Sequence, residues 1–363
     1  MPASAPQTFS DREPLSLSVV RRRFASTFSP NPLIYWCDLL ISSIVGWSAF
    51  LIAATAPTVS LLYVIATLVA IVALLRAAIF IHELSHMKRG TVPGFELAWN
   101  LLVGIPFLLP SLMYDSHGDH HRQATFATVH DPEYAPIAQW SRIRVAGFVV
   151  STLVVPILLL LRWGVVGPLS FFLSPLRHFL IAHASSLAIN HHYERPQPSP
   201  QEQLRWYTQE TATALSAWTA LLAIANGTPP LHWAYQWYIV GAGIACVNQV
   251  RTLAAHRYHN DGQQLTAVEQ LLDSINLTNG YFLTVFAAPV GLRYHALHHF
   301  LPTVPYHSLG RLHRQLLTEL APDSAYHRTV EHGLLSAIQK LVRRSFTPPN
   351  VGALRTDRAG EEA

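Results

Sequence analysis

The sequence predicts an all-α integral membrane protein: a helical transmembrane bundle of at least four spans with a cytoplasmic cap rich in histidine. Two observations concern composition. Half of the 363 residues are hydrophobic and only 13% are charged, whereas soluble domains carry about 25% charged residues. The third observation is that three histidine clusters follow apolar segments, so the polar chemistry is expected at the ends of spans.

The first two predicted spans are residues 33–56 and 59–81. Each run reaches the length of about 20 residues that crosses the hydrocarbon core of a bilayer. The link at residues 56–58 is too short for a domain, so both ends of this helical hairpin lie on one side. Arg21, Arg22 and Arg23 precede the hairpin, and the positive-inside rule places that side in the cytoplasm.

Further apolar runs occupy residues 143–162, 165–189, 211–226 and 231–250. The second of these contains Arg177, whose charge is costly against lipid, so we expect that run along the interface or against the bundle. Residues 96–113 are apolar but interrupted by prolines, and they predict a re-entrant or surface helix rather than a span. The exact number of spans between residues 140 and 252 is left open.

Three parts are expected along the chain. Residues 1–30 form a cytoplasmic N-terminal tail, residues 31–320 form the membrane domain, and residues 321–363 form a cytoplasmic C-terminal tail that is partly disordered. The net charge of +4 suits the cytoplasmic face of a membrane. No run of Lys or Arg alternates with stacking aromatic residues, which argues against a nucleic-acid partner.

Eight histidines are concentrated in three short segments. "HELSH" holds two histidines four residues apart, and "HGDHH" and "RYHALHHF" each hold three. Side chains three or four residues apart share one face of a helix, so each segment can direct its imidazoles toward one point. The eight residues are His82, His86, His117, His120, His121, His295, His298 and His299.

This number of imidazoles predicts two metal ions. Imidazole is the commonest metal ligand of proteins, and eight of them exceed what one tetrahedral zinc ion can use. The clusters can meet at one site if an even number of crossings separates His121 from His295. A pair of metal ions that activates O2 can remove hydrogen from an unactivated methylene, which no acid–base pair of side chains can do.

The order and spacing HxxxH, HxxHH and HxxHH resemble the histidine boxes of the membrane-bound fatty acid desaturase superfamily, which includes acyl-lipid and sphingolipid desaturases, hydroxylases and carotenoid ketolases. The resemblance spans roughly residues 33–320. It implies two iron ions, O2 as co-substrate, and a ninth histidine between the last span and the third box. His256 in "RTLAAHRYHN" stands in that place, with His259 as the alternative.

Two features depart from the acyl-CoA desaturases of this superfamily. In those enzymes an asparagine four residues before the extra histidine contributes to the second iron site through a water, whereas Thr252 stands at that position here. The first box is also HxxxH rather than HxxxxH. The resemblance therefore favours the acyl-lipid or sphingolipid type.

The resemblance implies oxygen-dependent desaturation of a long acyl chain on a membrane lipid. Hydroxylation of the same kind of chain is the alternative, because both reactions begin with the same hydrogen abstraction. Since the chain shows no flavin, haem or rubredoxin motif, electrons are expected from a separate ferredoxin or cytochrome b5-type protein. Basic residues near the boxes are candidates to dock such an acidic carrier: Arg122, Arg257, Arg293 and Arg311.

Carboxylates are expected behind the ligands, because a metal-bound imidazole normally donates its other N–H to a carboxylate, a carbonyl or a water. By their proximity to the boxes, the candidates are Glu83, Asp119, Asp131 and Asp273.

Two other classes of function fit parts of the pattern. "HELSH" is also HExxH, in which two histidines bind zinc and the glutamate is the general base, as in intramembrane metalloproteases. Such a protease needs a distant aspartate ligand, and Asp261 in the only "DG" lacks the expected preceding motif. A membrane carrier of metal or haem is less favoured, because transport sites lie near the bilayer midplane rather than at span ends.

Overall fold

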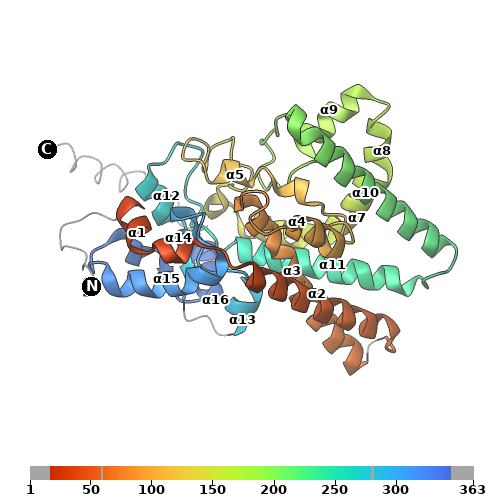
Figure 1. Cartoon of the computed structure of the whole chain (residues 1–363), viewed down its shortest axis with the longest axis horizontal. Helices are drawn as coiled ribbons and strands as arrows, with labels where there is room; N and C mark the ends of the chain where they lie inside the picture. Colours follow the sequence, from red (N-terminus) through yellow and green to blue (C-terminus); the bar gives the residue numbers. More distant parts are fainter. Residues whose placement is uncertain (1–16, 59, 279–281, 345–363) are drawn as a thin grey trace.

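The computed structural model describes residues 17–58, 60–278 and 282–344. These residues are mainly helical, and their one sheet pairs the two-residue strands β1 (Asn276–Leu277) and β2 (Val330–Glu331) in parallel. Long helices form a bundle at one end of the molecule, and short helices form a cap at the other end (Figure 1). The predicted all-α class is confirmed.

The bundle begins with the hairpin of α2 (Pro32–Thr55) and α3 (Leu61–His86). Asn31 and Ser60 cap the two helices by accepting hydrogen bonds from backbone N–H groups in the first turn, which satisfies donors that a helix start leaves unpaired. The two helices approach closely at Gly46, where a Cβ atom would lie 2.5 Å from Leu74 Cγ. The predicted spans at residues 33–56 and 59–81 correspond to these helices.

Three helices in the described part of the chain are long and apolar enough to cross a membrane: α2, α3 and a continuous helix over residues 142–170. The third comprises α6 (Arg142–Val150), η5 (Ser151–Val154), α7 (Val155–Leu161), η6 (Arg162–Val166) and α8 (Gly167–Ser170). These helices expose large apolar side chains such as Leu61, Ile143 and Ile157. Such surfaces suit lipid rather than water, and they identify an integral membrane protein.

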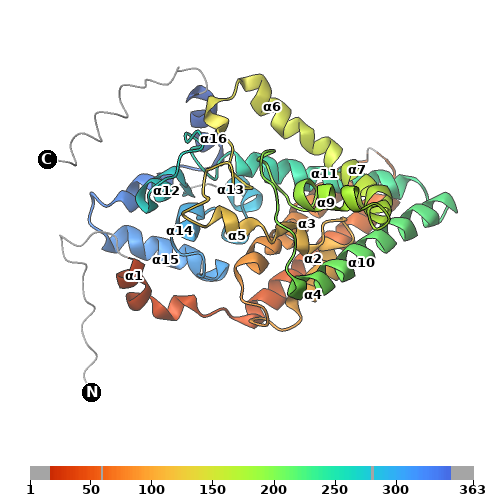
Figure 2. The same ribbon diagram turned by 90° about the horizontal axis from the view of Figure 1, so that it is seen from above.

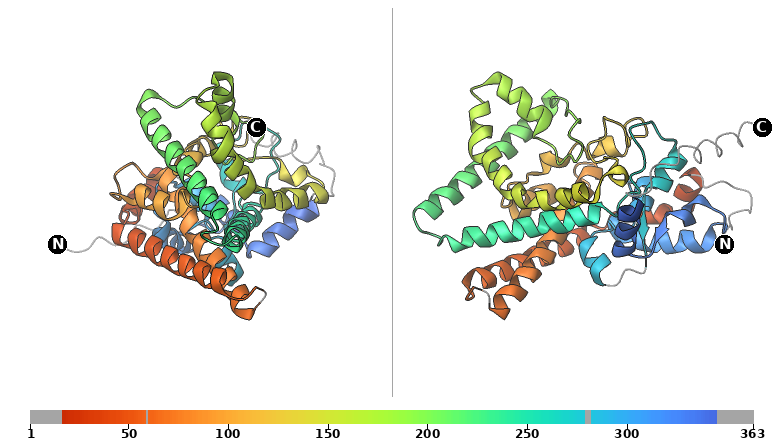
Figure 3. Two further views of the ribbon diagram at one scale, coloured as in Figure 1. Left: turned by 90° about the vertical axis from the view of Figure 1, so that its right-hand side faces the viewer. Right: turned by 180° about the vertical axis from the view of Figure 1, so that it is seen from behind.

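The next helices are α9 (Ser174–His183), α10 (Pro200–Ala225) and α11 (His232–Thr252). Arg177 of α9 pairs with the buried Glu210 of α10 through two nitrogen–oxygen distances of 2.9 and 2.6 Å, so α9 packs against the bundle. α11 packs against α3, and α10 and α11 (green and teal) extend away from the cap in the same general direction as the hairpin (Figure 3).

The segment interrupted by prolines forms α4 (Phe95–Trp99), the π-helical turn η2 (Asn100–Gly104) and η3 (Ser111–Tyr114). It packs on α3 as a short helix, and the buried Trp99 indole N–H donates to the Ala77 carbonyl at 2.8 Å. Leu97 and Leu101 remain exposed on its outer side. This arrangement agrees with the predicted re-entrant or surface helix.

The cap contains α5 (His117–His120) and α14 (His295–Phe300), which carry histidines of the second and third boxes and lie near each other in Figure 2. Its core includes Leu309, Leu312 and Leu316, which α15 (Tyr306–Glu319) buries on one face against Leu297 of α14. The cap elements are α1 (Leu17–Arg23), η1 (Ala25–Phe28), α5 (His117–His120), η4 (Ile137–Gln139), α12 (Ala267–Asp273), α13 (Phe282–Ala287), α14 (His295–Phe300), α15 (Tyr306–Glu319), η7 (Ala325–Thr329) and α16 (Leu334–Arg344).

Folded elements continue past residue 320. Glu331 of β2 accepts from Arg257 at 3.1 Å and from Lys340 at 2.5 Å, and Leu341 of α16 is buried. Residues 321–344 thus pack on the cap, while residues 345–363 lie outside the described residues. The boundaries at residues 30 and 320 stay predictions.

Cysteine labelling tests the predicted cytoplasmic position of the boxes. Single cysteines at the exposed positions Gln123 and Gln263, in a chain with Cys37 and Cys246 replaced by Ser, should react with an impermeant maleimide only after the membrane is permeabilised. Thr58→Cys, in the link of the hairpin, should react from outside and serves as the control. Labelling of positions 123 and 263 from opposite sides would contradict a shared site.

Candidate metal centre

All nine predicted histidines converge in the structure, and they divide into two groups. The ligand atoms within each group lie within 4.8 Å of one another. The five-histidine group is His82, His86, His117, His121 and His298, and the four-histidine group is His120, His256, His295 and His299. Each group could hold one metal ion.

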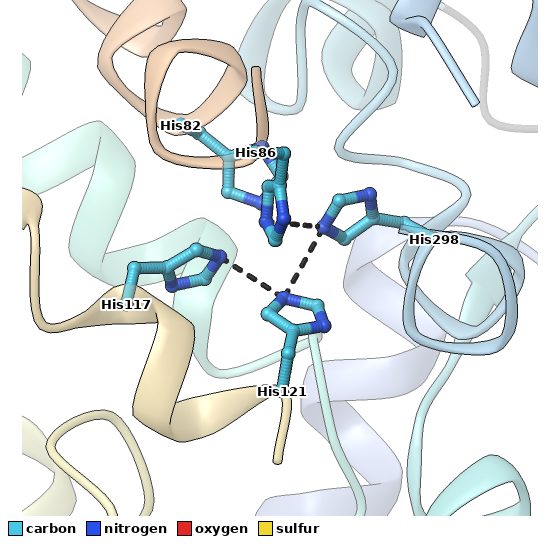
Figure 4. Close-up of side chains that lie close together, drawn as sticks. All are labelled: His82, His86, His117, His121 and His298. Carbon is cyan, nitrogen blue, oxygen red and sulfur yellow. Dashed lines mark hydrogen bonds between the residues drawn. The ribbon is translucent and has the colours of Figure 1, made fainter. Parts of the chain in front are cut away.

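The five-histidine group forms where three helical segments meet (Figure 4). His82 and His86 stand one turn apart at the cytoplasmic-side end predicted for α3, and α5 and α14 bring the other histidines to the same point. Because the apolar part of α3 ends at these residues, the group lies at the junction of bundle and cap. Among the described residues, one helix between His121 and His295, residues 142–170, is long and apolar enough to span, so the even number of crossings and the minimum of four spans stay predictions.

The distances between ring nitrogens in this group match those expected between ligands of a single metal ion. The Nε2 atoms of His117 and His121 are 3.0 Å apart, those of His86 and His298 are 3.0 Å apart, and those of His121 and His298 are 3.2 Å apart. Two ligands at right angles with metal–nitrogen bonds of about 2.1 Å are about 3.0 Å apart. The spacing therefore fits one shared ion.

The four-histidine group has the same spacing. His256 Nε2 lies 3.2 Å from His120 Nε2 and 2.9 Å from His295 Nε2, and His299 Nε2 lies 3.1 Å from His295 Nε2. His259, the alternative ninth ligand, is exposed and belongs to neither group. The geometry thus selects His256.

Burial prepares these side chains to bind a cation. Burial, strengthened by neighbouring histidines, holds the pKa values of His121, His295 and His299 well below the usual range, so the rings are neutral, as metal ligands must be. Both ring nitrogens of His82 are buried without a hydrogen-bond partner among the described residues. Buried polar groups are normally paired, and a metal ion would supply the missing partner.

Carboxylates lie close to the Nδ1 atoms of one histidine in the five-histidine group and of two histidines in the four-histidine group. Glu133 Oε1 lies 2.5 Å from His117 Nδ1, both Asp131 oxygens lie 2.9 Å from His120 Nδ1, and Asp273 Oδ2 lies 3.3 Å from His256 Nδ1. Such contacts fix the ring so that Nε2 presents its lone pair to a metal. Asp131 was predicted in this role. Asp273, also predicted, lies beside His256, but its Oδ2 makes no hydrogen bond among the described residues, and the Ser274 hydroxyl lies 3.3 Å from the same His256 Nδ1.

Glu133 was missed by the sequence analysis. Burial by itself would raise the pKa of this carboxyl, but His117 and the Tyr114 hydroxyl lower it to about 2, so the group is ionised. The available signal was its place in "HDPEY", two residues after Asp131. The backbone N–H of Glu133 donates to Asp131 Oδ1 at 2.8 Å, and this turn directs both carboxylates to histidines of the second box.

Residues 58–331 match the model of the family described as fatty acid desaturase. The chain belongs to this family. It is also 40% identical over 332 residues to a protein named ceramide hydroxylase from Caulobacter vibrioides (strain NA1000 / CB15N), an alignment that covers 90% of this chain and 94% of that relative. No solved structure matches the chain. Membership in the desaturase family makes the chain an oxidoreductase that acts on lipids by desaturation or hydroxylation.

Two predicted carboxylates do not support a ligand in this desaturase-family chain, and that expectation is wrong for both. Glu83 accepts hydrogen bonds from the Tyr35 hydroxyl and, at 3.2 Å, from the Tyr306 N–H. Asp119 pairs with Arg122 at 2.6 Å and with the Tyr193 hydroxyl at 2.8 Å. Consecutive residues of a helix point about 100° apart, so Glu83 is turned away from the face that presents His82.

The position of Glu83 also argues against the HExxH protease. A general base must reach the water that the zinc ion activates, but the Glu83 carboxylate is buried against α2 and the start of α15. Seven further histidines share the two groups with His82 and His86, which a single zinc ion leaves unexplained.

Thr252 replaces the asparagine of the acyl-CoA desaturases. Its hydroxyl donates to the Asn248 carbonyl within α11 at 3.0 Å. The hydroxyl hydrogen is therefore used, and only the oxygen lone pairs are available to a water near the four-histidine group.

Metal analysis of single variants tests the two groups. We expect about two metal ions per chain in the wild type, and about one in His298→Ala and in His295→Ala, because each variant opens one group only. His192→Ala is the control, since His192 is exposed and outside both groups. Unchanged metal content in both site variants would contradict the assignment.

Glu133→Gln tests the supporting carboxylate. Loss of its charge beside His117 should weaken metal binding by about 10- to 100-fold, as measured by competition with a chelator. The exposed Glu194→Gln should leave affinity unchanged, and equal affinities of the two variants would show that Glu133 does not support the ligand.

Proposed function

We propose that this chain is a di-iron, oxygen-dependent enzyme that hydroxylates an aliphatic chain of a ceramide-like membrane lipid. The observation that carries the proposal is the pair of buried groups of five and four histidines at the end of an apolar helical hairpin. The identity to a ceramide hydroxylase over nearly the whole length of both chains supports the choice of reaction.

Iron is the metal that suits this donor set and this task. Imidazole binds iron readily, and nine imidazoles in two groups provide for two ions. Two bound irons would supply the activation of O2 and the removal of hydrogen from an unactivated methylene. The histidines would hold the pair, and Glu133, Asp131 and Asp273 would keep the rings oriented.

Protein side chains also shield the metal centre. Tyr114 stacks on His117 with ring centroids 4.6 Å apart, and Phe126 contacts His120, His256 and His299 with centroids 5.3 to 5.4 Å apart. These rings limit access of bulk water, which protects a reactive centre from side reactions. A lipid chain from the bilayer is the kind of substrate that such an apolar surrounding favours.

Desaturation, which the sequence analysis favoured, is the second candidate. It is supported by the family model, and it differs from hydroxylation only after the first hydrogen abstraction. Because the relative named as a hydroxylase is 40% identical, whereas the family model is shared by both kinds of enzyme, we place hydroxylation first.

The proposal includes a separate protein as electron donor. Of the basic residues considered for its docking, Arg122 exposes 70% of its side chain and Arg311 is exposed. Arg257 instead binds Glu331 inside the cap, and Arg293 contacts the Tyr294 hydroxyl at 2.5 Å. Arg122 and Arg311 are therefore the better candidates for contact with an acidic carrier.

Expression in a bacterium that makes ceramide but lacks lipid hydroxylases tests the reaction. With a competent electron donor, we expect lipids heavier by one oxygen atom in mass spectra, and His298→Ala should abolish this product while His192→Ala retains it. Lipids lighter by two hydrogen atoms would establish desaturation instead. Unchanged lipids together with full iron content would overturn the proposed function.

A further inference from the structure

A polar cleft of about 210 Å³ opens beside the five-histidine group. It lies between the C-terminal end of α3, α4 and the N-terminal part of α10. The residues that matter to its chemistry are Ser85, Arg89, Glu96, Asp115, Glu202 and Arg205.

The cleft adjoins both the metal centre and the lipid-facing surface. Tyr114 forms part of its wall and stacks on His117 with centroids 4.6 Å apart. On the outside, Leu97 of α4 and Leu204 of α10 expose 65% and 77% of their surface, and each is adjacent in sequence to a charged residue of the cleft. A lipid at this position can keep its head in the cleft while its chain stays among apolar side chains.

The charge balance of the cleft disfavours an anion. Its lining carries three carboxylates (Glu96, Asp115 and Glu202) and two guanidinium groups (Arg89 and Arg205), a formal balance of −1. Arg205 is also already paired, with Glu96 at 2.9 Å and with Asp115. Asp115 is paired in addition with Arg195 at 3.1 Å. A phosphate would therefore meet guanidinium groups that carboxylates already occupy, and like charges of phosphate and carboxylate in a partly desolvated site repel.

The cleft does offer hydrogen bonds to an uncharged head. Among the described residues, the hydrogen bonds to the Glu96 and Asp115 carboxylates use Glu96 Oε1 and Asp115 Oδ2. The second oxygen of each carboxylate can therefore accept from an O–H or N–H donor. The hydroxyl of Ser85, which also lines the cleft, donates to the His82 carbonyl at 2.6 Å and keeps its oxygen lone pairs for a further O–H or N–H donor.

We propose that this cleft binds the head of the lipid substrate and selects an uncharged head with hydroxyl and amide groups over a phosphate-bearing head. The inference rests on the proposed function and deepens it by naming the headgroup class and the residues that recognise it. A ceramide head, with two hydroxyls and one amide, has this chemistry.

The test compares two lipids with the same acyl chain, a ceramide and a phosphatidic acid, offered to the iron-loaded enzyme in vesicles of neutral lipid. We expect a higher kcat/KM for the ceramide. The double variant Glu96→Gln, Glu202→Gln changes the formal charge of the residues that line the cleft from −1 to +1. It should lower the ratio of kcat/KM for ceramide to kcat/KM for phosphatidic acid by about fivefold or more.

The substitutions are chosen to preserve structure. Glu202 completes the capping box of α10 with Ser199, and glutamine serves equally at that position. Glutamine at position 96 retains a carbonyl oxygen to accept from Ser111 and Arg205. Glu194→Gln, an exposed change outside the cleft, is the matched control and should leave the ratio unchanged. If the double variant does not fold, Glu202→Gln alone should lower the ratio about twofold.

Each outcome has a distinct meaning. An unchanged ratio in a variant that retains iron and thermal stability would overturn the headgroup site, as would a wild-type preference for phosphatidic acid. If the wild type modifies neither lipid although iron and electron donor are present, the proposed function itself fails. A product from both lipids at equal rates would retain the proposed function and refute the selection of the head.

Discussion

The structure depends on the gathering of nine imidazoles into two groups, whose ring nitrogens face one another at the junction of bundle and cap. A ring whose Nδ1 donates to a carboxylate presents only an acceptor at Nε2, so His120, which Asp131 holds at 2.9 Å, cannot donate to the His256 Nε2 that lies 3.2 Å away. Buried ring nitrogens without a partner cost free energy, as for both nitrogens of His82 among the described residues, and a metal ion held by each group would remove that cost. The supporting carboxylates, the end of the hairpin and the cap all serve to hold these rings in place.

A few buried polar contacts hold the histidine-bearing segments of the cap in fixed positions. Asn276 of β1 accepts from the Leu297 N–H of α14 at 3.0 Å and donates to Thr329 at 2.8 Å, so one side chain joins the third box to the segment before β2. The parallel pairing of β1 with β2 then connects the box to residues beyond position 320. Rigid support of this kind matters because small displacements of ligands or substrate reduce catalysis strongly.

Bundle and cap divide the tasks that a lipid-modifying enzyme must combine. The hairpin provides an apolar surface and delivers two histidines at its end, and the cap provides the remaining ligands and their carboxylates. The cleft beside Tyr114 adds a third environment, in which Arg205 and its carboxylate partners remain polar next to exposed leucines. Oxidation chemistry, chain binding and head recognition are thus expected within one small region, but on different side chains.

The sequence by itself determined the helical class, the hairpin and the identity of eight of the nine histidines, because apolar run length and the spacing of three or four residues act within a single helix. Tertiary structure alone decided how the boxes divide: the second box gives His117 and His121 to one group and His120 to the other. It also selected His256 over His259 and placed Glu133 rather than Glu83 behind a ligand. These choices depend on contacts between segments far apart in the chain, such as His120 with His256, and local periodicity carries no information about which distant face a side chain will meet.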